Sequence, residues 1–213
     1  MHRSCPKITR VKVPAHYTQK LMHLMKNHPN KEAMYIDRDL AIDDPSDSQM
    51  IRYFPKSIRS LVMPRYRFHS QPHFLDLLDI RLCENLRLID LRDCVVNYSS
   101  YFKLKNVEQL IMKKVTIESN SLQKFFISRK APLNKLELDS VNEETDLTSR
   151  IPHWTQLADL HLETFPISPQ HVEYINPGRL TTLVIDRCES LNREVVLNLV
   201  ARAPRLSYIS LSH

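Results

Sequence analysis

The chain has 213 residues, with 30 lysines and arginines, 24 aspartates and glutamates, and a single glycine, Gly178. Average usage would give about 15 glycines in a chain of this length. Because phosphate loops, dinucleotide-binding turns and nucleophile elbows each need several glycines at fixed spacing, nucleotide-dependent enzymes and α/β-hydrolases are disfavoured. No apolar run exceeds five residues, far fewer than the roughly 20 that span a bilayer, and we expect no membrane span.

The net charge of +6 is concentrated in the first third of the chain. Residues 1–72 contain thirteen basic and six acidic residues, and no acidic residue precedes Glu32. This acid-free start shares some composition with a mitochondrial transit peptide. Pro6, Pro14 and the scarcity of serine instead favour a structural role for it. We therefore expect a cytoplasmic or nuclear protein and keep a mitochondrial one as the alternative.

One pattern, apolar-x-x-apolar-x-apolar, recurs along nearly the whole chain. Its nine copies begin at residues 8, 33, 58, 86, 107, 133, 157, 180 and 206, with steps of 21 to 28 residues, and the second copy is degenerate. Such spacing is typical of leucine-rich repeats, in which each unit is a short strand and a return segment. We expect an α/β fold: a leucine-rich repeat solenoid of about eight or nine units, with a parallel concave sheet and helices on the convex side. It forms a single domain over 1–213, divergent and basic in 1–72 and clearer in 86–213.

The segments between the motifs have the periodicity of helices. Each carries apolar side chains on one face, and a serine followed by proline is typical of a helix start. These predicted helical segments are 15–28, 73–82, 119–129 and 190–201, with a further helix that starts at Ser168-Pro169. Prolines precede six of the nine motifs, where they end the helix and favour extended backbone.

The unit that runs from Leu180 to Cys188, with the helical segment that ends at Pro204, has a distinctive form. It resembles the cysteine-containing leucine-rich repeat of F-box/LRR substrate receptors of ubiquitin ligases. Leu86 to Cys94 has the same form. The resemblance implies a substrate-reading role beside Skp1/cullin-type ligase subunits. No F-box is recognisable before the repeats and no polar capping unit at either end, so we expect a fragment or ends that a partner covers.

The four cysteines form no C-x-x-C pair, so the sequence predicts no metal site. Cys94 and Cys188 lie four predicted strands apart, or about 19 Å, which is beyond the reach of a disulfide. We expect free, buried thiols in a reducing compartment. His69 and His73 have ligand spacing, but the intervening Pro72 disfavours a helix there. With no catalytic constellation, we predict no enzymatic activity and no cofactor.

The candidate binding surface follows from strand alternation, which turns the residues between the apolar positions outward onto the concave face. Asp139, Glu163 and Asp186 then form one row of like charge, which costs stability unless Lys135 or His161 compensates. A site for a basic peptide and a solvated polar face both explain such a row. The predicted partner-binding residues are Lys113, Lys135, Glu137, Asp139, Asp159, His161, Glu163, Asp186 and Tyr208.

These features predict a non-enzymatic protein–protein recognition module whose partner is another protein or a peptide, with a basic peptide favoured by the acidic row. The substrate-binding part of a ubiquitin ligase is the narrower hypothesis. One alternative is a mitochondrial assembly or coupling factor. Another is an RNA-associated protein that uses the basic first third, where Tyr53, Phe54, Tyr66 and Phe68 alternate with arginines and lysines. No RNA-binding motif accompanies these residues, so nucleic acid is disfavoured against an acidic protein.

Overall fold

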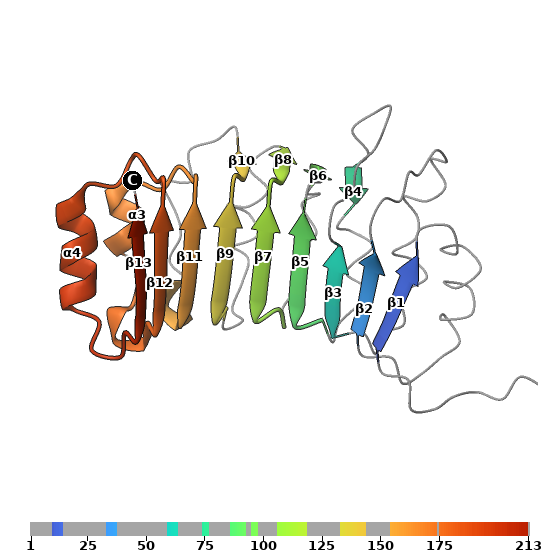
Figure 1. The fold of residues 1–213 in the computed structure, drawn as a ribbon, viewed down its shortest axis with the longest axis horizontal. Helices are drawn as coiled ribbons and strands as arrows, with labels where there is room; N and C mark the ends of the chain where they lie inside the picture. Colours follow the sequence, from blue (N-terminus) through green and yellow to red (C-terminus); the bar gives the residue numbers. More distant parts are fainter. Residues whose placement is uncertain are drawn as a thin grey trace, which may run out of the picture.

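The computed structural model describes residues 10–14, 33–37, 59–63, 74–76, 86–92, 95–97, 106–118, 133–143, 154–173 and 175–212. These residues form an α/β fold around one open sheet of nine parallel strands (Figure 1). The strands lie side by side in chain order. They are β1 (Arg10–Pro14), β2 (Ala33–Asp37), β3 (Ser60–Met63), β5 (Leu88–Arg92), β7 (Gln109–Lys113), β9 (Lys135–Asp139), β11 (Asp159–Glu163), β12 (Thr182–Asp186) and β13 (Tyr208–Ser212).

The sheet buries the repeated apolar positions of the sequence on one face. In each strand from β5 to β12, the second and fourth residues are buried. Leu136, Leu160 and Leu183 are aligned by the strand register and are completely inaccessible to solvent. Because side chains alternate across a strand, the first, third and fifth residues face the other way. The repeat therefore sets both the core and the outward face.

The turns that leave the strands are built without glycine. Lys114, Ser140, Thr164 and Arg187 each follow the last residue of a strand, and each has a φ between 48° and 51°. The amide N–H of each donates to the carbonyl of the last residue in the next strand, as from Thr164 to Asp186 at 2.9 Å. Left-handed backbone usually favours glycine. In this protein the hydrogen bonds to the next strand hold four residues other than glycine in left-handed backbone. The one glycine, Gly178, has no positive φ.

Four short strands form a second parallel sheet, in the order β10-β8-β6-β4. They are β4 (Phe74–Asp76), β6 (Val95–Asn97), β8 (Thr116–Glu118) and β10 (Asn142–Glu143). The prediction of a helix over 73–82 is wrong at Phe74–Asp76, because this backbone is extended and pairs with Val95–Asn97. Periodicity alone cannot separate short apolar strands from helical turns.

The helices that the structure describes belong to the last units of the chain. The predicted helix over 190–201 is confirmed as α4 (Arg193–Ala201), whose N-cap Asn192 accepts a hydrogen bond from the Val195 amide at 2.8 Å. The helix predicted to start at Ser168-Pro169 is confirmed as α3 (Pro169–Glu173). Two 3₁₀ helices, η5 (Trp154–Gln156) and η6 (Pro177–Arg179), precede β11 and β12. The helices predicted over 15–28 and 119–129 lie outside the described residues.

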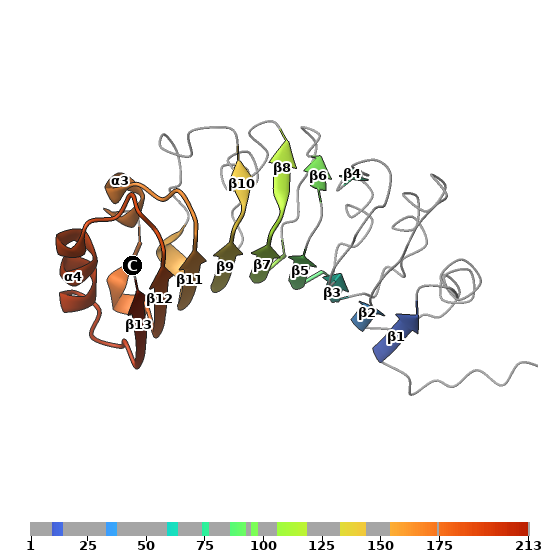
Figure 2. The same ribbon diagram turned by 45° about the horizontal axis from the view of Figure 1, so that its top comes forward.

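The nine-stranded sheet is curved, and Figure 2 shows it along the inner side of an arc, with the second sheet and α3 on the outer side. This arrangement is compatible with a solenoid. In the part of the chain that the structure describes, no helix is long and apolar enough to cross a membrane. The outward face of the sheet is therefore the broad concave surface on which the predicted binding residues can be placed.

Candidate protein-binding face

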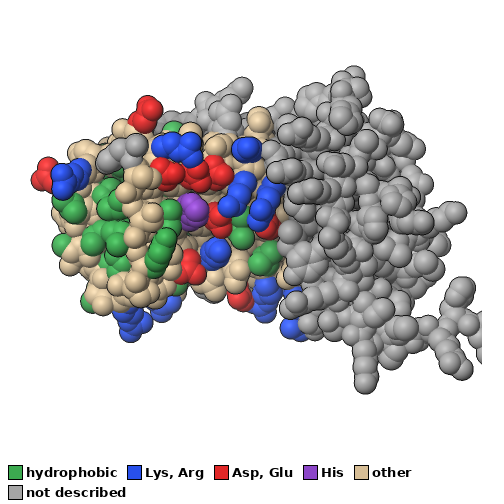
Figure 3. Space-filling model, in the orientation of Figure 1, with side chains coloured by type: hydrophobic (Ala, Val, Ile, Leu, Met, Phe, Trp, Pro, Cys, Tyr) green, Lys and Arg blue, Asp and Glu red, His purple; other side chains and the backbone are tan. Residues whose placement is uncertain are grey.

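Three rows of side chains cross the concave face, and the strand register defines each row. Acidic side chains gather over the middle of this face, with lysines and arginines around them and one histidine among them (Figure 3). The first row is Leu88, Gln109, Lys135, Asp159, Thr182 and Tyr208. The central row is Asp90, Ile111, Glu137, His161, Val184 and Ser210. The last row is Arg92, Lys113, Asp139, Glu163, Asp186 and Ser212.

Glu137 is the hub of the central row. Its carboxylate forms an ion pair with Lys113 of the neighbouring strand and lies 3.6 Å from Nζ of Lys135 and 3.5 Å from Nδ1 of His161. The residue is only 8% exposed. Burial raises the pKa of Glu137, but the hydrogen bond and charge of Lys113, with the charges of His161 and Lys135, outweigh it and hold that pKa below its usual value. Glu137 is therefore a well-compensated anion.

The last row continues this network toward β13. Nε2 of His161 lies 3.8 Å from Glu163, so the imidazole stands between two carboxylates. Arg187 pairs with Glu163 and lies 3.5 Å from Asp186, whose carboxylate also accepts a hydrogen bond from Ser212. The hydrogen bond from Ser212 lowers the pKa of Asp186. Burial raises that pKa by a smaller amount, and the charge of Arg187 lowers it further, so the pKa stays below its usual value. The predicted repulsion in this row is thus relieved locally.

Two carboxylates of the face have hydroxyl partners but no cationic partner among the described residues. Asp139 accepts a hydrogen bond from Ser140 Oγ at 2.8 Å, and Asp159 accepts one from Thr181 Oγ1 at 3.1 Å. The register places Asp159 opposite Lys135, four residues before Asp139. The two carboxylates are therefore about 14 Å apart, on adjacent strands. They are the negative charges that the network leaves available to a partner.

A further ion pair lies at the other side of the face, on β5. The guanidinium of Arg92 donates two hydrogen bonds of 2.8 Å to the carboxylate of Asp90, and Asp90 is only 6% exposed. Ile111 lies between Asp90 and Glu137 in the central row and is also buried. The central row is thus buried at these positions, which strand alternation alone does not predict.

The structure brings most of the predicted site residues together. Lys113, Lys135, Glu137, His161, Glu163 and Asp186 form one connected network, Asp139 and Asp159 flank it, and Tyr208 stands apart on β13 with 57% of its surface exposed. Sequence reasoning missed Arg187. This residue follows a strand and turns back over the face from left-handed backbone, so a search of strand positions alone could not find it.

Cys188 packs beneath this turn. Its side chain is buried, and its Sγ lies 3.4 Å from the carbonyl oxygen of Asp186 and 3.7 Å from that of Leu162. Burial raises the pKa of the thiol, against hydrogen bonds from the backbone. Cys188 is free, as predicted. Cys5, Cys83 and Cys94 lie outside the described residues, which contain no group of three potential ligands that could hold a metal ion.

Most of the basic first third cannot be placed on this face. Tyr53, Phe54, Tyr66 and Phe68, on which the RNA hypothesis depends, lie outside the described residues. Comparison with protein-family models and with curated proteins finds no match to this sequence.

Proposed function

We propose that the chain is a leucine-rich repeat solenoid of about eight or nine units that serves as a non-enzymatic protein recognition module. The observation that carries this proposal is the charged network over the concave face, which runs from Lys113 on β7 to Ser212 on β13. A parallel ladder fixes the strands that present these side chains. A face held in one geometry loses little conformational entropy when a partner binds.

The favoured partner is a basic segment of another protein. Asp139 and Asp159 lack cationic partners among the described residues and lie about 14 Å apart, which four residues of an extended chain span at about 3.3 Å each. An extended peptide with two lysines or arginines four residues apart would meet both carboxylates. Complementary charge speeds association and discriminates against acidic partners.

The test compares labelled peptides by fluorescence anisotropy on the 213-residue chain. We expect a peptide with two lysines four residues apart to bind more tightly than one of equal charge with adjacent lysines. Asp139→Asn with Asp159→Asn should weaken binding about tenfold, whereas Glu173→Gln with Glu189→Gln, two exposed positions outside the three rows, should not. Equal binding by both peptides, or equal loss in both double variants, would leave only a solvated polar face.

The narrower proposal is membership of a ubiquitin ligase, which the cysteine-containing repeat form around Cys188 supports. The packing of Cys188 beneath the strand exit fits the structural part of that cysteine in such a repeat. Purification of the tagged chain from its native source under mild conditions tests it. Recovery of Skp1/cullin-type subunits in stoichiometric amount supports the proposal, and their consistent absence refutes it.

A further inference from the structure

Asp90 shows how arginine meets a carboxylate of the concave face when both oxygens are open. No hydroxyl of the described residues donates to Asp90. Arg92 donates from Nε to Oδ1 and from Nη2 to Oδ2, at 2.8 Å each. Two parallel hydrogen bonds of this kind are the strongest way in which a guanidinium binds a carboxylate. Arginine therefore uses both oxygens here.

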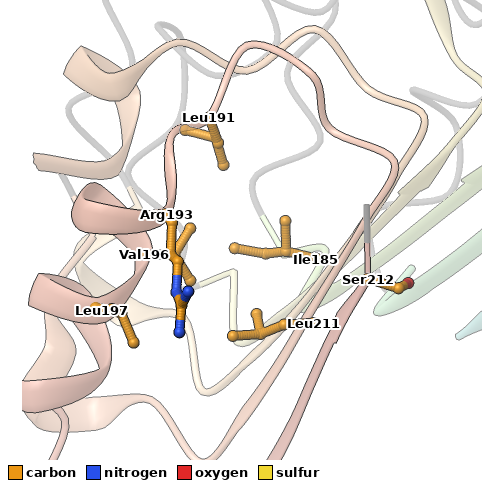
Figure 4. Close-up of a pocket in the computed structure, with 7 residues that line it drawn as sticks. All are labelled: Ile185, Leu191, Arg193, Val196, Leu197, Leu211 and Ser212. Carbon is orange, nitrogen blue, oxygen red and sulfur yellow. The ribbon is translucent and has the colours of Figure 1, made fainter.

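Asp186 shows the other case, in which a hydroxyl already holds one oxygen. Its Oδ1 accepts a hydrogen bond from Ser212, whose side chain points away from Leu211 and from α4 in Figure 4. Arg187 approaches Asp186 only at Oδ2 and through one nitrogen, Nε, at 3.5 Å, while its Nη2 pairs with Glu163. Of these two aspartates, only the one without a hydroxyl partner has the two-point contact with arginine.

The two outer carboxylates of the face have the arrangement of Asp186. Oδ1 of Asp139 accepts a hydrogen bond from Ser140 Oγ at 2.8 Å, and Oδ1 of Asp159 accepts one from Thr181 Oγ1 at 3.1 Å. No described residue donates to Oδ2 of either aspartate. Each carboxylate therefore offers a partner one open oxygen.

Backbone hydrogen bonds fix the residues that carry these hydroxyls. The amide of Ser140 donates to the last carbonyl of β11 at 2.9 Å, and the amide of Thr181 donates to the carbonyl of Ala158 at 2.8 Å. Oγ1 of Thr181 also lies 3.1 Å from that carbonyl. Because a hydroxyl has one hydrogen, Thr181 shares it between Ala158 and Asp159, whereas the Ser140 hydroxyl has only Asp139 as its acceptor among the described residues. Ser140 is thus the stronger of the two donors.

We propose that Ser140 and Thr181 make the concave face selective for lysine over arginine in the segment that it binds. This inference rests on the recognition function proposed above. A lysine ammonium is a compact charge that can donate to one oxygen, whereas an arginine must displace the hydroxyl or lose one of its two parallel hydrogen bonds. On carboxylates with both oxygens open, arginine has the advantage, because a guanidinium is more weakly hydrated than an ammonium. The two hydroxyls reverse that preference.

The experiment compares two fluorescent peptides that differ only in having lysine or arginine at both of two positions four residues apart. We expect the lysine peptide to bind the unmodified 213-residue chain at least about threefold more tightly. Ser140→Ala with Thr181→Val opens both carboxylates, so the arginine peptide should then bind at least as tightly as the lysine peptide. Ser140→Ala alone should change the ratio of the two affinities more than Thr181→Val alone.

The matched control is Ser207→Ala with Thr116→Val, which removes the same two hydroxyl types at exposed positions outside the three rows. It should keep the preference for lysine. Circular dichroism checks that each variant folds, and the comparison of peptides on the unmodified chain needs no variant.

The outcomes separate this inference from the function on which it rests. Equal or tighter binding of the arginine peptide to the unmodified chain would overturn the selectivity. So would an unchanged preference for lysine in the folded Ser140→Ala, Thr181→Val variant. The recognition function would survive both results if Asp139→Asn with Asp159→Asn still weakened binding. Failure of both peptides to bind, or binding that is insensitive to those two asparagines, would instead refute the function itself.

Discussion

Replacing Thr164 by glycine should stabilise the protein, although glycine usually destabilises folded structure. Thr164 has a φ of 48° in the turn between β11 and the segment that follows. An L-residue in left-handed backbone costs about 1–2 kcal/mol, and the added freedom of glycine in the unfolded chain takes back about 0.5–1 kcal/mol. The side chain of Thr164 is exposed, so its loss removes little packing. The net gain should be about 0.5–1 kcal/mol.

Thermal unfolding followed by circular dichroism measures this gain. For a chain of this size 1 kcal/mol shifts the Tm by about 2–4 °C, so we expect an increase of about 1–4 °C for Thr164→Gly. Thr164→Ala keeps the Cβ atom and should change the Tm little. Thr116→Gly makes the same replacement at an exposed position in the extended strand β8 and should lower the Tm.

The difference in Tm between Thr164→Gly and Thr116→Gly shows whether the left-handed backbone at Thr164 costs free energy. If Thr164→Gly lowers the Tm as much as Thr116→Gly, the turn stores no strain and the reasoning is refuted. Lys114 has the same conformation two strands away, at about 9.6 Å. At that separation effects should be close to additive, so Lys114→Gly combined with Thr164→Gly should give about twice the gain.

Further predictions concern the core, the thiol and the network. Leu160→Ala removes a completely buried side chain and should cost about 2–5 kcal/mol in chemical denaturation, against under about 1 kcal/mol for Leu197→Ala on the exposed face of α4. Cys188 should resist alkylation until the protein unfolds, as followed by mass spectrometry of its peptide, because burial raises its pKa; rapid labelling of the native chain would contradict this. The pKa of Glu137 is lowered in the folded state, so its carboxylate stabilises the fold above the unfolded pKa of about 4.3 and loses this effect as pH falls through the folded value. Glu137→Gln should therefore lower the Tm at pH 7, and the deficit should shrink below about pH 4; a constant deficit would count against it.

The outward rows could be predicted because the repeat fixes the register. Once the apolar positions of successive units are aligned, Asp139, Glu163 and Asp186 must occupy equivalent places on adjacent strands, and the strand pairing places them there. A parallel sheet with one buried face tolerates no slip of one residue, since such a slip would turn the apolar set toward solvent. A short local motif thus predicted contacts between distant residues.

The remaining features depend on interactions that no short pattern records. The second sheet consists of strands of two or three residues, such as Val95–Asn97, which are too short to show alternation. Arg187 reaches Glu163 from a turn whose left-handed backbone is imposed by the ladder and not by glycine. Ile111 and Glu137 are buried although they lie on the outward face, and strand alternation alone does not predict this burial.

The network over the concave face has a consequence for how a partner binds. Glu137 already has two lysines and a histidine as neighbours, so a partner that competed for it would have to break existing contacts and desolvate them, which usually cancels the Coulombic gain. Asp139 and Asp159 carry no such cost, because their partners among the described residues are hydroxyls. Affinity should therefore come from these two outer carboxylates, while the inner pairs hold the face in shape. If the proposed recognition function holds, a partner must match the spacing of these outer charges and not their number.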